Sequence, residues 1–406
     1  MDENLLNNNI PNIGFSEAEL DFIQKYKHED VTKLVLKSAQ FKELDVKKLA
    51  AQILSRQKAS KKLPEWSAVD KLIFPPALSV EQCSSEATAK YKSSIISGKT
   101  LVDITGGMGV DSFYLSKNFE ETHYFEQQEE VAKTAFYNFN LLNAKGISVH
   151  NQDSIASLSN TFDKVDWIYA DPARRDANRQ KVVLLSDCTP DIKFHLPTLF
   201  EHTSNILLKT SPLLDIDLAA QELKFVKEIH VMGYDHECKE LLFNIDKNFG
   251  QEDLVIKSQI INAEGKVISS VAFTRKQERE AEIELCEPLA YLYEPHPAVL
   301  KAGAFKYLGA LFGVKKLAVH SHLYTSDKLV SDFPGRIFEI IGVSKPDAKE
   351  INTYVTDNKA NLTLRNFPAK IDDLRKKWRL KEGGNIYLFA TTLFNQKKTV
   401  VVTKKL

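Results

Sequence analysis

One short segment constrains the fold of this 406-residue chain more than any other, the stretch Leu-Val-Asp-Ile-Thr-Gly-Gly-Met-Gly-Val-Asp at 101–111. An apolar run ends in Asp103, a loop that contains Gly107 and Gly109 follows, and a helix-like segment comes next. Such a strand, glycine loop and helix often form the nucleotide site of parallel α/β sheets, because glycine permits close approach and positive φ. The glycine spacing matches neither the P-loop nor Gly-x-Gly-x-x-Gly, so a tight turn without a ligand remains an alternative.

Three later apolar runs also end in an acidic residue, at the spacing of successive β–α units. Glu126 follows the first of these runs, Asp153 the second and Asp171 the third. Ligands of open parallel sheets bind outside the carboxyl ends of the strands. The four acids together therefore predict an α/β fold with one binding site along that edge of the sheet.

Residues from about 80 to 250 resemble a class I S-adenosylmethionine (SAM)-dependent methyltransferase. The resemblance rests on Asp103-Ile-Thr-Gly-Gly-Met-Gly109, on Glu126 and Asp153 after later strands, and on Asp171-Pro172. It implies a Rossmann-like α/β fold with the seven-stranded sheet of that family, and SAM as the cofactor. By this likeness Asn205–Pro212 supplies the fifth strand, and 228–234 with 240–245 supply the closing antiparallel pair.

The resemblance also assigns residues to the cofactor. Gly107 and Gly109 match the family's glycines, Thr105 stands where many members have glycine, and Asp171 opens the motif that faces both cofactor and acceptor. Glu126 is expected to bind the ribose hydroxyls, a role that suits a carboxylate at the end of the second strand. Two assignments stay open: Asp103 could contact the cofactor or brace the loop, and Asn151 or Gln152 could replace Asp153 at the adenine.

The fourth motif, Asp171-Pro-Ala-Arg-Arg175, departs from the pattern of methyltransferases that act on amino groups of nucleic acids. Those enzymes carry [Asp/Asn]-Pro-Pro-[aromatic], where the aromatic ring stacks on a flipped base. Here Ala173 replaces the second proline and Arg174 the aromatic residue, which puts attack by a base amine in doubt. We take Asp171, Pro172, Arg174 and Arg175 as candidate catalytic residues. The two arginines could clamp a phosphate or stack on a base, or form internal salt bridges.

Cysteines and apolar stretches restrict the class of protein. The four cysteines are scattered without a Cys-x-x-Cys pair, which argues against a metal site or a disulfide framework. The first residues, Met-Asp-Glu-Asn, do not resemble a signal peptide. No apolar run approaches the ~20 residues needed to span a bilayer. We therefore expect a cytoplasmic protein without a membrane partner, whose oligomeric state the sequence leaves open.

A net charge of zero conceals a strong asymmetry along the chain. Residues 301–406 contain 20 Lys and Arg against 9 Asp and Glu, a net charge of +11. Such a region suggests a polyanionic partner. Within it, 370–381 is a candidate amphipathic helix, expected to end at Gly383-Gly384. Its candidate RNA-binding residues are Arg375, Lys376, Lys377 and Arg379. The alternative is that these residues form an ordinary solvated face of the helix. Trp378 could stack on a base but is better suited to a core.

The whole arrangement resembles a bacterial subgroup of these methyltransferases that has a ferredoxin-like insert and a C-terminal THUMP-like domain. The resemblance rests on 171–175, on Tyr293-Glu-Pro-His-Pro297, on Arg365-Asn-Phe-Pro368 and on 374–389. Glu294 and His296 could approach the active site, but fixing a turn is the favoured role. The expected domains are N-terminal helical 1–78, SAM-binding 79–250, ferredoxin-like or β-hairpin insert 251–290, and basic α+β THUMP-like 291–406.

THUMP domains are associated with RNA modification, so the resemblance implies RNA, such as tRNA or rRNA, as the partner. Three functions remain open on the sequence. The favoured one is a SAM-dependent RNA methyltransferase. The others are a non-catalytic protein that binds SAM and RNA, and a methyltransferase of a protein or small molecule.

Overall fold

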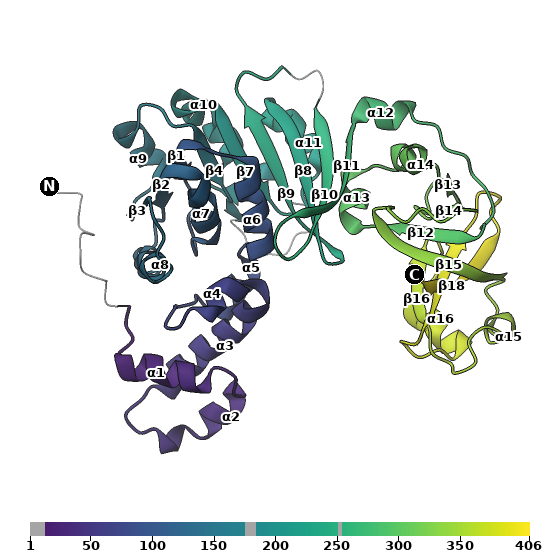
Figure 1. Cartoon of the computed structure of the whole chain (residues 1–406), viewed down its shortest axis with the longest axis horizontal. Helices are drawn as coiled ribbons and strands as arrows, with labels where there is room; N and C mark the ends of the chain where they lie inside the picture. The colour runs from purple at the N-terminus through teal and green to yellow at the C-terminus, as the bar shows by residue number, and fades with distance from the viewer. Residues whose placement is uncertain (1–12, 175–183, 251–253) are drawn as a thin grey trace. The chain divides into compact units, whose positions relative to one another are not determined.

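A computed structural model describes residues 13–174, 184–250 and 254–406 of the chain (Figure 1). The chain forms two compact units, each of which is described by itself. Unit 1 comprises Met1–Lys227, Leu241–Gln251 and Ile261–Lys266, and unit 2 comprises Glu228–Glu240, Glu252–Ile260 and Val267–Leu406.

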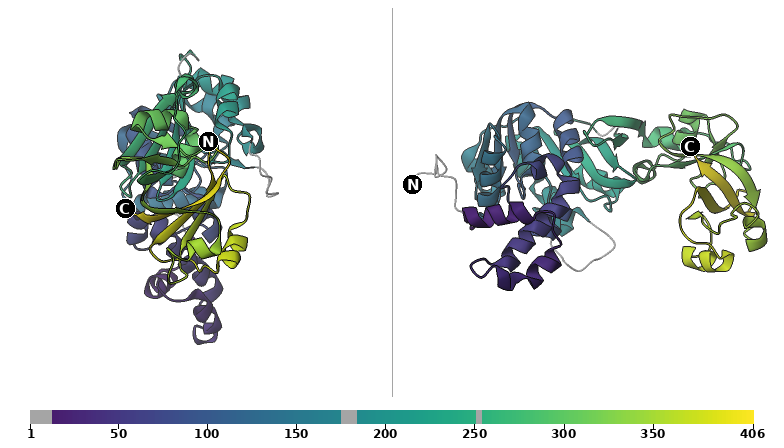
Figure 2. Two further views of the ribbon diagram at one scale, coloured as in Figure 1. Left: turned by 90° about the vertical axis from the view of Figure 1, so that its right-hand side faces the viewer. Right: turned by 60° about the horizontal axis from the view of Figure 1, so that its bottom comes forward.

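The N-terminal region is helical, as expected. Ser16 caps its first helix through a capping box, in which Ser16 Oγ accepts from the Glu19 amide and Glu19 Oε2 accepts from the Ser16 amide. The helices, which cluster in both views of Figure 2, are α1 Glu17–Tyr26, α2 Val31–Leu36, α3 Val46–Lys62, α4 Pro64–Ala68 and α5 Ala77–Gln82, with a 3₁₀ turn at Ser38–Gln40.

These N-terminal helices share a hydrophobic core with the glycine-loop region. Trp66 of α4 is fully buried and meets Phe113 edge to face, with the ring centroids 5.6 Å apart. Glu86 extends the contact between the two regions, because its carboxylate accepts hydrogen bonds from the amides of Glu65 and Trp66 at 3.0 and 2.9 Å. The N-terminal region is therefore packed onto the element that holds the predicted binding loop.

The large sheet has the strand order β11-β10-β8-β9-β7-β4-β1-β2-β3. The strands β3, β2, β1, β4 and β7 pair in parallel, and β9 pairs with β7 antiparallel. The bounds are β1 Gly98–Asp103, β2 Phe119–Phe125, β3 Ile147–His150, β4 Trp167–Ala170, β7 Asn205–Thr210, β8 Val226–Tyr234, β9 Glu237–Asp246, β10 Val255–Ile261 and β11 Val267–Thr274. The seven neighbouring strands β3, β2, β1, β4, β7, β9 and β8 form the expected seven-stranded sheet, and β10 and β11 extend this sheet by two strands.

Helices connect the parallel strands and place the carboxyl ends of those strands at one edge. Buried residues such as Leu101, Ile168 and Leu207 show that the strands form the centre of the core. The helices are α6 Glu86–Ile95, α7 Val110–Leu115, α8 Glu129–Leu141, α9 Ser154–Thr161, α10 Ile192–His202 and α11 Ile216–Leu223, with 3₁₀ turns at Ser116–Asn118 and Leu185–Asp187. A two-stranded ribbon of β5 Ala173–Arg174 and β6 Cys188–Thr189 follows β4.

The C-terminal region of unit 2 is an α+β module around a second sheet, with the order β13-β14-β12-β15-β18-β17-β16. Its strands are β12 Tyr291–Pro295, β13 Lys315–Lys316, β14 Tyr324–Ser326, β15 Gly335–Ser344, β16 Asn361–Arg365, β17 Ile386–Thr392 and β18 Lys398–Lys405. Its helices are α12 Arg275–Glu280, α13 Pro297–Ala302, α14 Lys306–Phe312, α15 Ala348–Ile351 and α16 Ile371–Trp378. The small α+β module expected from the sequence is confirmed.

Helix α16 is shorter than the predicted segment 370–381. It ends at Trp378, because Arg379 adopts a left-handed conformation with φ of 56° and caps the helix, so the prediction that Gly383-Gly384 ends it was wrong. Trp378 is fully buried in a core with Leu388 and Val402, which confirms the core role over base stacking. Across the described ranges, no helix combines the length and the apolar character that a membrane span requires.

Candidate active site

The glycine loop after β1 is filled by aromatic rings on one side and open on the other. A Cβ on Gly109, whose φ is +85°, would lie 2.5 Å from Phe139 Cζ, and a Cβ on Gly106 would enter the ring of Tyr124. Gly107, with φ of +54°, differs, since the nearest atom to its Cβ position is the Thr105 carbonyl oxygen at 3.8 Å. The open face at Gly107 is therefore where a ligand can approach the backbone closely.

Asp103 braces this loop from the inside. Its side chain is buried, its Oδ1 accepts from the Thr105 amide at 2.9 Å, and its Oδ2 accepts from the Ser112 hydroxyl of α7. Burial raises the pKa of Asp103 to about 7, and the neighbouring charges of Asp111 and Asp171 act in the same direction. Of the two roles left open by the sequence, the geometry favours bracing.

Thr105 connects the glycine loop to the fourth motif. Its hydroxyl donates to Asp103 Oδ1 at 3.3 Å and accepts from the Asp171 backbone amide at 2.6 Å. A glycine at this position would provide neither bond. The structure thus gives a reason for the residue that departs from the usual family pattern.

Glu126 lies directly after β2, half-buried, beside the open face of the loop. Its Oε2 accepts from the Gly107 amide at 3.1 Å and its Oε1 accepts from the Gln128 amide at 2.8 Å. These two bonds hold the carboxylate at the end of the strand. Since each carboxylate oxygen can accept more than one hydrogen bond, Glu126 keeps the capacity to bind a diol.

Asp153 caps helix α9 at the next strand end. Its Oδ1 accepts from the Ala156 amide at 3.0 Å and its Oδ2 accepts from Gln127 Nε2 at 2.9 Å. Asn151, one of the two alternative residues with Gln152, donates from Nδ2 to the carbonyls of Glu126 and Gln127 at 2.9 and 3.0 Å. Both side chains therefore shape this end of the site, and an adenine contact by Asp153 remains a prediction.

Asp171 follows β4 and is paired with a lysine that the motifs in the sequence did not indicate. Lys209 Nζ donates to Asp171 Oδ2, and the Lys209 residue is only 9% exposed. The one signal in the sequence is a lysine after the apolar run Ile206-Leu-Leu at the end of the predicted fifth strand. The parallel pairing of β4 with β7 brings the two residues together.

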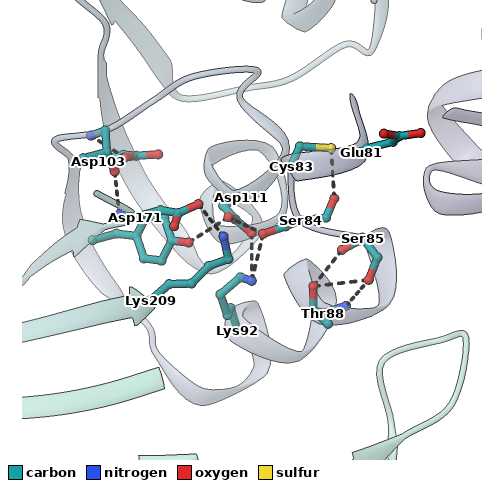
Figure 3. A network of polar contacts seen from close by, with 12 residues as sticks. Glu81, Cys83, Ser84, Ser85, Thr88, Lys92, Asp103, Asp111, Asp171 and Lys209 are labelled. Carbon is teal, nitrogen blue, oxygen red and sulfur yellow. Dashed lines mark hydrogen bonds and ion pairs between the residues drawn. The ribbon is translucent and has the colours of Figure 1, made fainter. Parts of the chain in front are cut away.

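A second buried ion pair lies behind the first (Figure 3). Lys92 of α6 is fully buried, with its Nζ 3.1 Å from Asp111 Oδ1. Asp111 Oδ2 accepts from Ser84 Oγ and from the Tyr169 hydroxyl, both at 2.7 Å. Burial raises the pKa of Asp111, but the cations Lys92 and Lys209 outweigh it and hold that pKa below its usual value.

The described residues include only part of the fourth motif, 171–175, which is predicted to face the methyl acceptor. Pro172 follows Asp171, and Ala173–Arg174 pairs with Cys188–Thr189 as a short antiparallel ribbon. The side chain of Arg174 and all of Arg175 lie outside the described residues. Whether these arginines clamp a phosphate or form internal salt bridges therefore stays a prediction. In the described part of the chain, no group of three or more His, Cys, Asp and Glu side chains could hold a metal ion.

Within unit 2, the candidate RNA-binding side chains differ in availability. Lys376, Lys377 and Arg379 are exposed, whereas Arg375 is half-buried and its Nη1 lies 3.1 Å from Glu382 Oε2. The first three are therefore the better candidates for contact with an anionic partner.

Glu294 and His296 both have structural contacts, but only His296 lies at a turn, and Glu294 links strands instead of fixing the turn expected from the sequence. Buried Glu294 accepts hydrogen bonds from Arg336 Nε at 2.7 Å and Arg365 Nη2 at 2.8 Å. His296 Nδ1 accepts from the Ala298 amide at 3.1 Å and so caps helix α13. Glu294 thereby ties β12 to β15 and β16.

Comparison with known proteins places this geometry in a family. A ferredoxin-like domain model matches residues 291–334, and a THUMP domain-like model matches residues 335–405. The predicted bounds of these two domains, 251–290 and 291–406, differ from the matched ranges. No curated protein matches the chain. A solved structure of a "putative methyltransferase" from Porphyromonas gingivalis is 32% identical, with a TM-score of 0.84, over 96% of this chain and 99% of that one.

Two further solved structures match only part of the chain. A Streptococcus mutans protein in complex with SAH is 15% identical, with a TM-score of 0.29, over 40% of this chain and 96% of that one. TrmK of M. capricolum, also in complex with SAH, is 14% identical, with a TM-score of 0.32, over 40% of this chain and 68% of that one. On the full-length match and the two domain models, the chain belongs to the class I methyltransferase family, in the subgroup with a ferredoxin-like and a THUMP-like domain.

Proposed function

We propose that this protein is a SAM-dependent methyltransferase of the cytoplasm that acts on structured RNA, such as tRNA or rRNA. The observation that carries the proposal is the open face of Gly107 with the Glu126 carboxylate bonded to the Gly107 amide, at the strand edge where Asp171 also lies. A backbone accessible to a ligand, beside an acid that can bind a diol, suits a nucleoside cofactor.

The residues present fit SAM. Gly107 and Gly109 would border the cofactor, Glu126 would accept its ribose hydroxyls, and Asp153 would stand near the adenine. SAM supplies a methyl group already activated by the sulfonium. The protein then contributes mainly position and electrostatics, with Asp171 facing the acceptor and Asp103 and Thr105 holding the loop in place.

Charge and exposure support RNA as the acceptor. Residues 301–406 carry a net charge of +11, and Lys376, Lys377 and Arg379 are exposed on or next to α16. Neutralising phosphates releases counterions, so such a surface should bind RNA with a strong salt dependence. The match to a THUMP domain-like model at 335–405 points the same way.

One observation keeps a second function open, a protein that binds SAM and RNA without transferring a methyl group. The fourth motif lacks the second proline and the aromatic residue of the base-amine enzymes, since Ala173 and Arg174 occupy those positions. A measurement of turnover decides between the two functions.

Transfer of labelled methyl from SAM to total RNA tests the proposal. The RNA comes from cells that lack this gene and, in parallel, from wild-type cells, and the Asp171→Ala protein serves as the inactive control. We expect label only in RNA from the cells that lack the gene, and only when the unaltered enzyme is present. Absence of label, with SAM binding measured on the same sample, would contradict an RNA methyltransferase.

A further inference from the structure

The carboxylate of Asp171 has a counter-ion before any substrate binds. Lys209 Nζ donates to Asp171 Oδ2, and the Asp171 side chain keeps 34% of its surface exposed while that of Lys209 keeps 11%. A largely buried lysine requires an anionic or polar partner. The Thr105 hydroxyl also holds the Asp171 backbone amide. The position of the Asp171 carboxylate is thus fixed by contacts within the protein, while part of its surface remains exposed to solvent.

This pairing disfavours an amine as the nucleophile. When an amine attacks a sulfonium methyl group, its nitrogen becomes positively charged. The Lys209 cation, fixed next to the Asp171 carboxylate, repels such an ammonium. The opposite holds for a hydroxyl, because its oxygen becomes more negative as its proton leaves, and a fixed cation stabilises that charge.

The residues beside Asp171 lack the aromatic side chain on which methyltransferases of base amines hold the base. Enzymes that act on a base hold it, flipped, against aromatic or apolar side chains. Here the second-proline position is Ala173, and the position of the aromatic residue is Arg174. A hydroxyl on the RNA backbone needs no such platform, and the 2′-hydroxyl is the group that distinguishes RNA from DNA.

We infer, on the basis of the proposed function, that the methyl acceptor is the ribose 2′-hydroxyl of RNA, with Asp171 as the proton acceptor and Lys209 as the cation that stabilises the reacting oxygen. The ribose oxygen forms a bond to the methyl carbon while the carbon–sulfur bond breaks. The electron pair of that bond remains on sulfur, which becomes a neutral thioether. The hydroxyl proton passes to the Asp171 carboxylate and from there to solvent.

The second ion pair supports Lys209 in this role. Asp111 is buried next to Lys92 and is held by Ser84 and Tyr169. Its negative charge also acts on Lys209. A buried carboxylate behind the lysine attracts the Lys209 amine and helps to hold it at the end of β7.

The chemical stability of the labelled product tests the inference. RNA from the gene-deleted cells is labelled from SAM and hydrolysed in alkali. A 2′-O-methyl group blocks cleavage of the neighbouring phosphodiester, so we expect the label in alkali-resistant dinucleotides. Label in ordinary mononucleotides would overturn the 2′-hydroxyl as acceptor while leaving an RNA methyltransferase in place. No label at all, with SAM bound, would overturn the proposed function and this inference together.

Variants of Lys209 test its role with the same RNA. Lys209→Met should lower the rate of transfer by about 100-fold or more, the usual effect of losing one group that stabilises the transition state, and Lys209→Arg should restore part of the rate. SAM affinity by calorimetry and the melting temperature separate this loss from misfolding. Lys193→Met is the matched control, because Lys193 is exposed and paired with Glu222 at 2.7 Å. Equal rates for Lys209→Met and Lys193→Met would contradict the assignment.

Discussion

The hydroxyl of Thr105 accepts a hydrogen bond from the backbone amide of Asp171 at 2.6 Å. The two residues belong to different motifs, the glycine loop after β1 and the Asp-Pro motif after β4. Because the same hydroxyl donates to Asp103, one side chain connects the glycine loop to the Asp-Pro motif.

Replacing Thr105 with valine should weaken this connection. The substitution keeps the shape but leaves the Asp171 amide without its partner, which typically costs about 1–3 kcal/mol for a buried group. We expect a lower free energy of unfolding and slower methyl transfer. Chemical denaturation measures the free energy of unfolding, and single-turnover assays measure the rate of methyl transfer. Thr105→Ser is the control that retains the hydroxyl. Valine and serine variants of equal stability and rate would show that the bond has no effect.

Replacing Glu126 with alanine should weaken SAM binding while the fold survives. Hydrogen bonds to a charged group contribute about 1.5–3 kcal/mol, so we expect the dissociation constant to rise roughly 10- to 100-fold by calorimetry. The dissociation constant of Glu126→Gln should lie between those of the wild type and Glu126→Ala, because the glutamine side chain keeps one acceptor oxygen for the Gly107 amide. An unchanged affinity in Glu126→Ala would exclude this residue from the cofactor site.

Breaking the buried pair of Lys92 and Asp111 should destabilise the protein. Removal of one partner of a buried pair leaves an uncompensated charge and costs about 3–5 kcal/mol. We expect this loss in Lys92→Met and in Asp111→Asn, measured by chemical denaturation. The double variant should be more stable than the sum of the two losses predicts, because neither charge is then left alone. Strict additivity would show that the two side chains do not interact energetically.

Asp103 should make stability depend on pH in a defined direction. Its pKa in the folded protein is raised to about 7 from an ordinary value of 3.8. Between these values the folded state binds a proton that the unfolded state releases. The contribution of Asp103 is thus most favourable at low pH and is lost as the pH rises through about 7. We expect the free energy of unfolding of the wild type, measured by denaturation, to decline from pH 5 to 8, whereas that of Asp103→Asn should lack this decline. Parallel curves of the free energy of unfolding against pH for the two proteins would contradict the prediction.

Neutralising the exposed cations at α16 should reduce the salt dependence of RNA binding. For Lys376→Gln, Lys377→Gln and Arg379→Gln together, we expect weaker binding. The slope of log K against log salt should be smaller by about 0.9 for each duplex phosphate that the variant no longer neutralises. A charge-matched control replaces the exposed Lys145, Lys193 and Lys227 of the sheet domain. Equal slopes in the two triple variants would remove these residues from the RNA-binding surface.

The sequence by itself determined the order of the elements and the positions of the acids that follow the parallel strands. Glycines and acids placed directly after apolar runs depend on local chain geometry, and this is why Gly107, Glu126 and Asp171 could be predicted to follow the ends of strands. Ser16 at the start of α1 is a comparable case, because the capping box joins two residues only three positions apart.

Only the tertiary structure decided which side chains meet at the site. The bond between Thr105 and Asp171 spans 66 residues of sequence, and the ion pair of Lys209 with Asp171 spans 38. No local pattern encodes such a pairing, because it depends on which strands become neighbours in the sheet and on how far each extends. The burial of Trp378 in a core with Leu388 and Val402 likewise depends on segments that are distant in the sequence.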